Sequence, residues 1–150
     1  MSQSLCKNFI HLVFSTKKRK PLISEDIQSE LFKYLGGILR NWESPSLIVG
    51  GTEDHIHILF LLSKNHALAD IVGELKSSSS MWIKSKGPQF AEFYWQNGFG
   101  AFSVSQSNVP TVKEYITIQR EHHRRISFQA EFRGLLKRHE VAFDERYVWG

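Results

Sequence analysis

The sequence predicts an α+β fold: a ferredoxin-like (RRM-like) antiparallel sheet with helices on one face, plus a C-terminal tyrosine-bearing helix and tail. Two observations support this prediction. Strand and helix patterns of hydrophobic residues follow one another in the order strand, helix, strand, strand, helix, strand or hairpin, helix. The second and third strands are too close in sequence for a crossover helix, which favours antiparallel pairing.

The elements of the first half are indicated by hydrophobic periodicity. Residues alternate in the first strand, and apolar residues recur at three- and four-residue steps in the helix that follows, with Ser24 as its expected N-cap. A Gly50-Gly51 turn or bulge separates the next two strands. The expected elements are a strand at Phe9 to Ser15, a helix from Ser24 to about Trp42, and strands at Ser46 to Val49 and His55 to Leu62.

The second half is bounded by turn and cap residues. A helix is expected from Asn65 or His66 until Gly87-Pro88 ends it. The Asn97-Gly98 pair between two β-prone runs predicts a hairpin of Phe93 to Trp95 with Phe99 to Ser105. Two further helices are expected, from Asn108 to about Arg125 and from Phe128 to His139.

Composition narrows the class of protein. Hydrophobic residues make up 41% of the 150 residues and charged residues 23%, an ordinary globular balance. The lone Cys6 excludes an internal disulfide and a thiolate metal cluster. Neither a membrane-spanning stretch nor a secretory signal is recognisable. We therefore expect one soluble domain over residues 1–150, located in the cytoplasm.

The distribution of charge suggests nucleic acid as a partner. The net charge is only +4, but Lys17, Lys18, Arg19 and Lys20 form an unbroken basic run, and Arg120 and Arg124 lie in a second basic cluster. Aromatic residues make up 13% of the chain. Cations that follow phosphates and rings that stack on bases suit single-stranded nucleic acid. These six basic residues are the expected DNA contacts; a solvated charged rim is the alternative.

Two histidines form a possible metal site. His55 and His57 are two residues apart on a predicted strand, so both imidazoles project from one face and can reach one ion. Glu53 and Asp54, just upstream, could be a further ligand or could orient a ring. Taken alone, the pattern equally fits two partly exposed histidines with no ligand.

A tyrosine and a glutamine form a second pair. Tyr115 and Gln119 are four residues apart and lie on one face of a predicted helix. A tyrosine hydroxyl is a poor nucleophile at neutral pH unless its target is polarised, which a metal on a phosphate would do. Gln119 offers a neutral oxygen ligand, and mixed nitrogen and oxygen ligands suit Mg²⁺ or Mn²⁺. The alternative is an amphipathic helix with a buried tyrosine and a surface glutamine.

Four stretches of the sequence, which occur in the order found in a known family, carry a resemblance to that family over nearly the whole chain. With them, the chain resembles the single-tyrosine HUH transposases (TnpA-type, of small bacterial insertion sequences), to which the REP-associated tyrosine transposases are related. The stretches are Phe9 to Lys17, Asp54 to Leu59, Trp95 to Val104, and the helix Val112 to His123; the segment Phe132 to Trp149 is similar as well.

The resemblance implies a set of roles. His55, His57 and Gln119 would bind a divalent metal, Mg²⁺ or Mn²⁺, and Tyr115 would be the nucleophile. The family cleaves single-stranded DNA near hairpins through a 5′-phosphotyrosine link that leaves a free 3′-OH. Its members act as homodimers, so Tyr115 would face the histidines of the partner chain, or those of its own chain after a helix movement.

The role of the C-terminal segment and the function of the protein each have alternatives. The C-terminal segment is longer than in the most compact members, so we expect it either to cover the active site or to extend the dimer. Other readings of the sequence are a non-catalytic single-stranded nucleic-acid-binding module, in which aromatic residues on the sheet stack bases, and a domesticated nuclease relative that cleaves DNA without mobilising an element.

Overall fold

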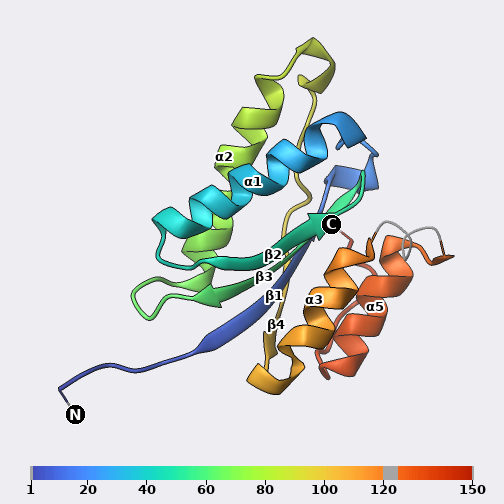
Figure 1. Cartoon of the computed structure of the whole chain (residues 1–150). Helices are drawn as coiled ribbons and strands as arrows, with labels where there is room; N and C mark the ends of the chain where they lie inside the picture. The colour runs from blue at the N-terminus through green and yellow to red at the C-terminus, as the bar shows by residue number, and fades with distance from the viewer. Residues whose placement is uncertain (1, 120–124, 150) are drawn as a thin grey trace.

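A four-stranded antiparallel sheet forms the centre of the protein (Figure 1). The computed structural model describes residues 2–119 and 125–149. The strands lie in the order β2-β3-β1-β4, the ferredoxin-like order that the sequence predicts. Their bounds are β1 Asn8–Ser15, β2 Ser46–Gly51, β3 His55–Leu62 and β4 Gly100–Val104.

Helices α1 and α2 cover one face of the sheet, and α3 and α5 cover the other (Figure 1). The expected C-terminal helix that carries the tyrosine is α3, and together with α5 it forms a helical layer on the opposite face of the sheet. Short 3-10 turns at Lys17–Arg19, Pro88–Phe90 and Gln106–Asn108 connect these elements. The helices are α1 Glu25–Asn41, α2 Leu68–Lys84, α3 Val109–Thr117 and α5 Phe128–Arg138.

The main hydrophobic core lies under α1 and α2. Alternate residues of β1 and β3 point to this face, so Leu12 and Phe14 pack with Ile56 and Ile58, and all four are essentially inaccessible to solvent. The apolar stripe of α1 completes this core with Leu31, Leu35 and Leu39. Burial of this side of the sheet fixes its register and therefore decides which residues face the other way.

The opposite face holds the candidate site residues. His11 on β1 and His55 and His57 on β3 alternate with the core residues and lie beneath α3 and α5. Two smaller apolar clusters anchor these helices: Ile116 of α3 packs with Leu59, and Phe132 of α5 packs with Phe102. The three histidines thus lie between the apolar cluster under α3 and the apolar cluster under α5.

Most predicted elements are confirmed within a few residues. The helix expected from Asn65 or His66 begins at Leu68, with Ala67 as its N-cap. Ser24 is the N-cap of α1, as expected, but its side chain makes no capping hydrogen bond. Helix α3 is described to Thr117, so the expected end near Arg125 falls beyond a stretch, residues 120–124, that the structure does not describe.

The predicted hairpin around Asn97-Gly98 is wrong. Trp95 bridges Thr16, and Gly100 pairs with Val13, so both runs lie antiparallel to β1 as one interrupted edge strand. Gly98 has a φ of 84°, the left-handed conformation that a reversing turn would also use. Here it makes a bulge, which the Lys76 ammonium of α2 holds by donating to the carbonyl oxygens of Gln96, at 2.7 Å, and of Gly98.

Among the described residues, no helix is both long and apolar enough to cross a membrane.

The contact between α3 and β2 depends on Gly50. A Cβ at this position would lie 2.8 Å from Ile116 Cγ2 and 2.9 Å from the Ile116 carbonyl oxygen. We expect Gly50→Ala to lower the free energy of unfolding by about 1–3 kcal/mol through overpacking. Gly73→Ala is the control, because that glycine of α2 has no heavy atom within 4 Å of such a Cβ, and it should be neutral or stabilising. Equal urea midpoints for the two variants would contradict this packing.

Candidate metal centre and tyrosine helix

His55 and His57 are fully buried and point to the same face of the sheet, as their spacing predicts. β3 pairs them with Ser15 and Val13 of β1, and the two ring centroids are 5.1 Å apart. Because both residues lie within one regular strand between paired neighbours, the imidazoles are held on a rigid support. The alternative of two partly exposed histidines is wrong.

The ring of His55 is oriented by the residues just before it. Its Nδ1–H donates to Asp54 Oδ1 at 2.6 Å, and the Thr52 hydroxyl donates to the same oxygen at 3.0 Å. Burial by itself would lower the pKa of His55, but the Asp54 hydrogen bond, the charge of Glu131 and the Gln119 hydrogen bond together raise it. Asp54 therefore directs Nε2 away from the strand end and toward Gln119 and Glu131, and such a second hydrogen bond at Nδ1 is usual for a histidine ligand.

His57 is oriented by a third histidine. His11 Nε2 lies 2.8 Å from His57 Nδ1, and both rings are buried. Burial and the neighbouring His57 lower the pKa of His11 to about 2, so this ring stays neutral and can accept a hydrogen bond from His57 Nδ1–H. His11 therefore orients the ring of His57 through Nδ1. The other ring nitrogen, His57 Nε2, points away from His11 and toward α5.

The structure adds a residue that the sequence analysis missed. Glu131 of α5 is 4% exposed, and its Oε1 lies 2.7 Å from His57 Nε2 and 3.6 Å from His55 Nε2. Its position carried a signal: Glu131 falls within the apolar stripe formed by Phe128, Phe132 and Leu135, where an acid is expected only with a partner.

Tyr115 of α3 and Gln119, which lies two residues past the end of that helix, approach the histidines. Gln119 Oε1 lies 3.0 Å from His55 Nε2, and the side chain is 1% exposed, so the alternative of a surface glutamine is wrong. The Tyr115 ring lies 5.7 Å from the ring of His57 of the same chain and 6.0 Å from that of His11, measured between centroids. The tyrosine helix and the histidines therefore meet within one chain.

The surroundings of Tyr115 keep its hydroxyl protonated. Burial and the negative charge of Glu131 raise its pKa above the ordinary value near 10. A phenol in this state is a weak nucleophile unless the group it attacks is polarised.

The donor atoms suit a divalent cation. His55, His57 and Glu131 each offer a ligand atom within 4.8 Å of the others. With its Nδ1–H directed to Asp54, His55 Nε2 faces two acceptor oxygens, those of Gln119 and Glu131. Lone pairs that converge in this way need a proton or a metal ion between them. Two imidazoles with one or two oxygens form a mixed set of the kind that binds Mn²⁺ or Mg²⁺.

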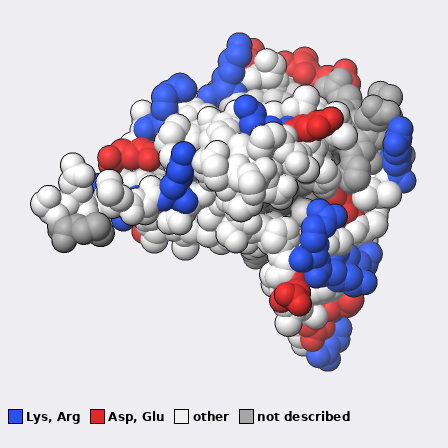
Figure 2. Space-filling model, turned by 60° about the horizontal axis from the view of Figure 1, so that its bottom comes forward, with Lys and Arg blue, Asp and Glu red and all other residues white. Residues whose placement is uncertain are grey.

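The first basic run, which is predicted to contact DNA, follows the end of β1, where Ser15 pairs with His55. Lys17, Lys18 and Arg19 form a 3-10 turn directly after β1, with Lys20 as its C-cap, and Lys18 and Arg19 both have a φ of 56°. Lys17, Lys18 and Lys20 line a surface pocket together with Glu92 and Tyr94. On the face shown in Figure 2, basic side chains form separate groups with acidic ones between them.

Arg120 and Arg124, the other predicted contacts, lie outside the described residues.

Comparisons with known proteins show which family and which solved structures this chain is similar to. Residues 4–119 match the family described as IS200-like transposases. A 1.90 Å crystal structure of a protein from Deinococcus radiodurans R1, named as a candidate transposase, has a TM-score of 0.62 at 22% identity, over 79% of this chain and 98% of that one. A REP-associated tyrosine transposase bound to a REP hairpin has a TM-score of 0.58 at 14% identity, over 82% and 74%. No curated protein matches the chain.

The chain belongs to the IS200-like transposase family, because the match spans well over half of its length. It is therefore a transposase, an enzyme that acts on DNA, and the two solved structures show that the sheet and its helices have the tyrosine transposase fold. The family match ends at Gln119, so α5 and Glu131 lie beyond it.

The hydrogen bond from His55 to Asp54 predicts a role in metal affinity. We expect Asp54→Asn to weaken Mn²⁺ binding about 10- to 100-fold, since the amide no longer fixes the tautomer that frees Nε2. Isothermal titration calorimetry measures the effect, with Asp70→Asn on the exposed start of α2 as the control. Unchanged affinity in Asp54→Asn would show that this carboxylate does not support a ligand.

Proposed function

We propose that this transposase cleaves and rejoins single-stranded DNA through a covalent tyrosine intermediate, with a divalent metal held at His55 and His57. The observation that carries the proposal is that Tyr115 lies beside His57 of its own chain, with 5.7 Å between the ring centroids, while Gln119, four residues further on, reaches His55. The proposed nucleophile and the proposed ligands are neighbours within one chain, which supports a reaction carried out by one subunit.

The reaction requires only groups of this kind. The Tyr115 oxygen attacks a backbone phosphorus, and its proton is released; the bond from phosphorus to the 3′ oxygen breaks, and that oxygen leaves as a free 3′-OH. The new phosphotyrosine ester conserves the energy of the broken bond, so rejoining by a 3′-OH needs no ATP. A bound divalent ion would neutralise charge on the phosphate oxygens, which is what a protonated tyrosine requires of its target.

Two oxygens compete for the role of third ligand. Gln119 Oε1 is closer to His55, whereas Glu131 Oε1 is closer to His57 and carries a negative charge. We propose that His55, His57 and Gln119 are the three principal metal ligands. Glu131, from the segment beyond the family match, would add a fourth, charged ligand.

The wider features of the reaction are proposals as well. The neighbour that was solved with a REP hairpin supports recognition of hairpin DNA at element ends. Lys17 to Lys20 are the proposed backbone contacts, because phosphates are generally bound by such exposed cations. We also propose a homodimer; since Tyr115 lies beside the histidines of its own chain, cleavage within one subunit is the arrangement that this structure favours.

The nucleophile is tested by Tyr115→Phe. Labelled single strands copied from the DNA flanking the gene, incubated with protein and Mn²⁺, should give a protein–DNA adduct on a denaturing gel. The adduct should be absent with Tyr115→Phe and with EDTA. It should be present with Tyr34→Phe, because Tyr34 of α1 stacks on Trp82 of α2, on the opposite face of the sheet from the histidines. Tight binding without adduct in the unaltered protein would favour the non-catalytic binding module instead.

The ligand role of Glu131 is tested by Glu131→Gln. Loss of the charged oxygen should weaken Mn²⁺ binding at least ~10-fold, because the remaining set is neutral. Glu140→Gln, just past the end of α5, is the matched control. If calorimetry shows equal or tighter binding in Glu131→Gln, the ion is held by the histidines and Gln119 alone.

A further inference from the structure

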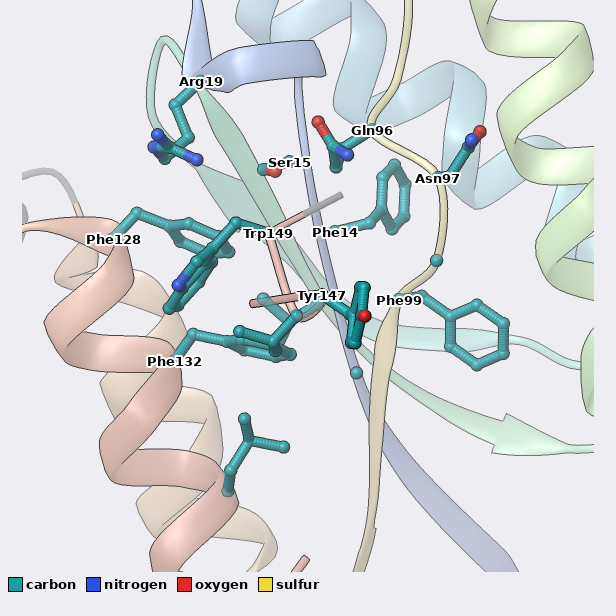
Figure 3. A pocket seen from close by; sticks show the side chains of 15 residues that line it. Phe14, Ser15, Arg19, Gln96, Asn97, Phe99, Phe128, Phe132, Tyr147 and Trp149 are labelled. Carbon is teal, nitrogen blue, oxygen red and sulfur yellow. The ribbon is translucent and has the colours of Figure 1, made fainter. Parts of the chain in front are cut away.

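An aromatic pocket lies directly beside the histidines, between α5 and the interrupted edge strand (Figure 3). Its volume is about 230 Å³, below the roughly 300–1,000 Å³ of pockets for drug-sized ligands. Phe128 belongs to both places, because it lines the pocket and its ring centroid lies 4.7 Å from that of His55. A group held in the pocket would therefore be next to the metal ligands.

Aromatic rings from three separate segments form the pocket. In Figure 3, Phe128, Phe132 and Trp149 lie on one side of the pocket and Phe99 lies across from them, with Tyr147 between the two sides. Phe99 and Tyr147 are 41% and 72% exposed, which is unusual for large side chains that could have packed inward. The five rings are those of Phe99, Phe128, Phe132, Tyr147 and Trp149.

Polar groups are placed among these rings. Gln96 and Asn97, from the interrupted part of the edge strand, bring side-chain amides, each with both donors and acceptors. Arg19, from the basic turn after β1, extends toward the same space (Figure 3). The pocket thus combines stacking surfaces, hydrogen-bonding amides and a cation.

We propose that this pocket binds one unpaired nucleobase of the DNA strand and so places the adjoining phosphate at Tyr115. A nucleobase needs flat apolar faces, an edge paired with amide groups, and a cation near its phosphate, and the pocket offers all three. The proposal rests on the proposed function. It adds a specificity site to which the C-terminal tail contributes Tyr147 and Trp149, residues beyond the family match.

The interruption of the edge strand has a role in this proposal. The Gln96 N–H still donates to the Ser15 carbonyl oxygen of β1 at 2.8 Å, and regular pairing resumes only at Gly100, so the bulge between them carries Asn97 and Phe99 to the pocket. Lys76 fixes the bulge from the other side of the sheet. The pocket therefore has a stable wall rather than a loose loop.

The test measures base recognition without cleavage. Fluorescence anisotropy in EDTA compares a labelled oligothymidylate of about 12 nucleotides with an abasic strand of the same length, which has the same phosphates and no bases. The unaltered protein should prefer the strand with bases by roughly 5- to 150-fold, the value of one stacked base. Phe99→Ala and Tyr147→Ala, both truncations of exposed rings, should each reduce this preference while leaving abasic-strand binding unchanged.

Tyr34→Ala is the control, since it removes a ring outside the pocket and should keep the preference. Equal affinity of the unaltered protein for both strands would overturn the pocket and leave the proposed function standing. A preference that survives in Phe99→Ala and Tyr147→Ala would also overturn it, by placing base recognition elsewhere. Binding of neither strand would contradict the pocket and the action on single-stranded DNA together.

Discussion

The structure depends on the convergence of lone pairs beneath α3 and α5. His55 Nε2 and His57 Nε2 face the oxygens of Gln119 and Glu131 in a space closed to solvent. Buried groups of this kind are costly unless a proton or a cation lies between them. The atoms come from β3, from Gln119 just past the end of α3, and from α5, so the packing of α3 and α5 on the sheet brings this site together.

The outer partners of the histidines follow from the same requirement. Asp54 and His11 occupy the Nδ1 atoms of the two rings, and each is buried beside its histidine. Both Nε2 atoms are therefore directed at the helices. Tyr115 completes the arrangement from α3, where burial and the Glu131 charge raise its pKa and leave activation to a polarised phosphate.

Periodicity allowed most of the fold to be predicted from sequence. Alternation in β1 and β3 gave the face of each histidine, and helical spacing put Tyr115 and Gln119 together. The hairpin prediction failed because Gly98 permits a left-handed conformation in a bulge as well as in a turn, and only pairing with β1 decides between them. That pairing is a long-range contact, which local sequence does not encode.

The ligand set was harder to predict because it combines distant segments. Glu131 is 74 residues from His57, and its only local signal was an acid within an apolar stripe. The pocket likewise needs the bulge, α5 and the tail in one place. Those features lie partly beyond residues 4–119, which match the family.

The most direct test of the account is mass spectrometry of the protein after reaction with flanking single-stranded DNA. Trypsin cleaves after Lys113 and Arg120 and should therefore release the peptide Glu114 to Arg120, in which Tyr115 is the only tyrosine. The account predicts nucleotide mass on this peptide in the presence of Mn²⁺ and none in EDTA. An adduct on another tyrosine, or one that forms without metal, would contradict it.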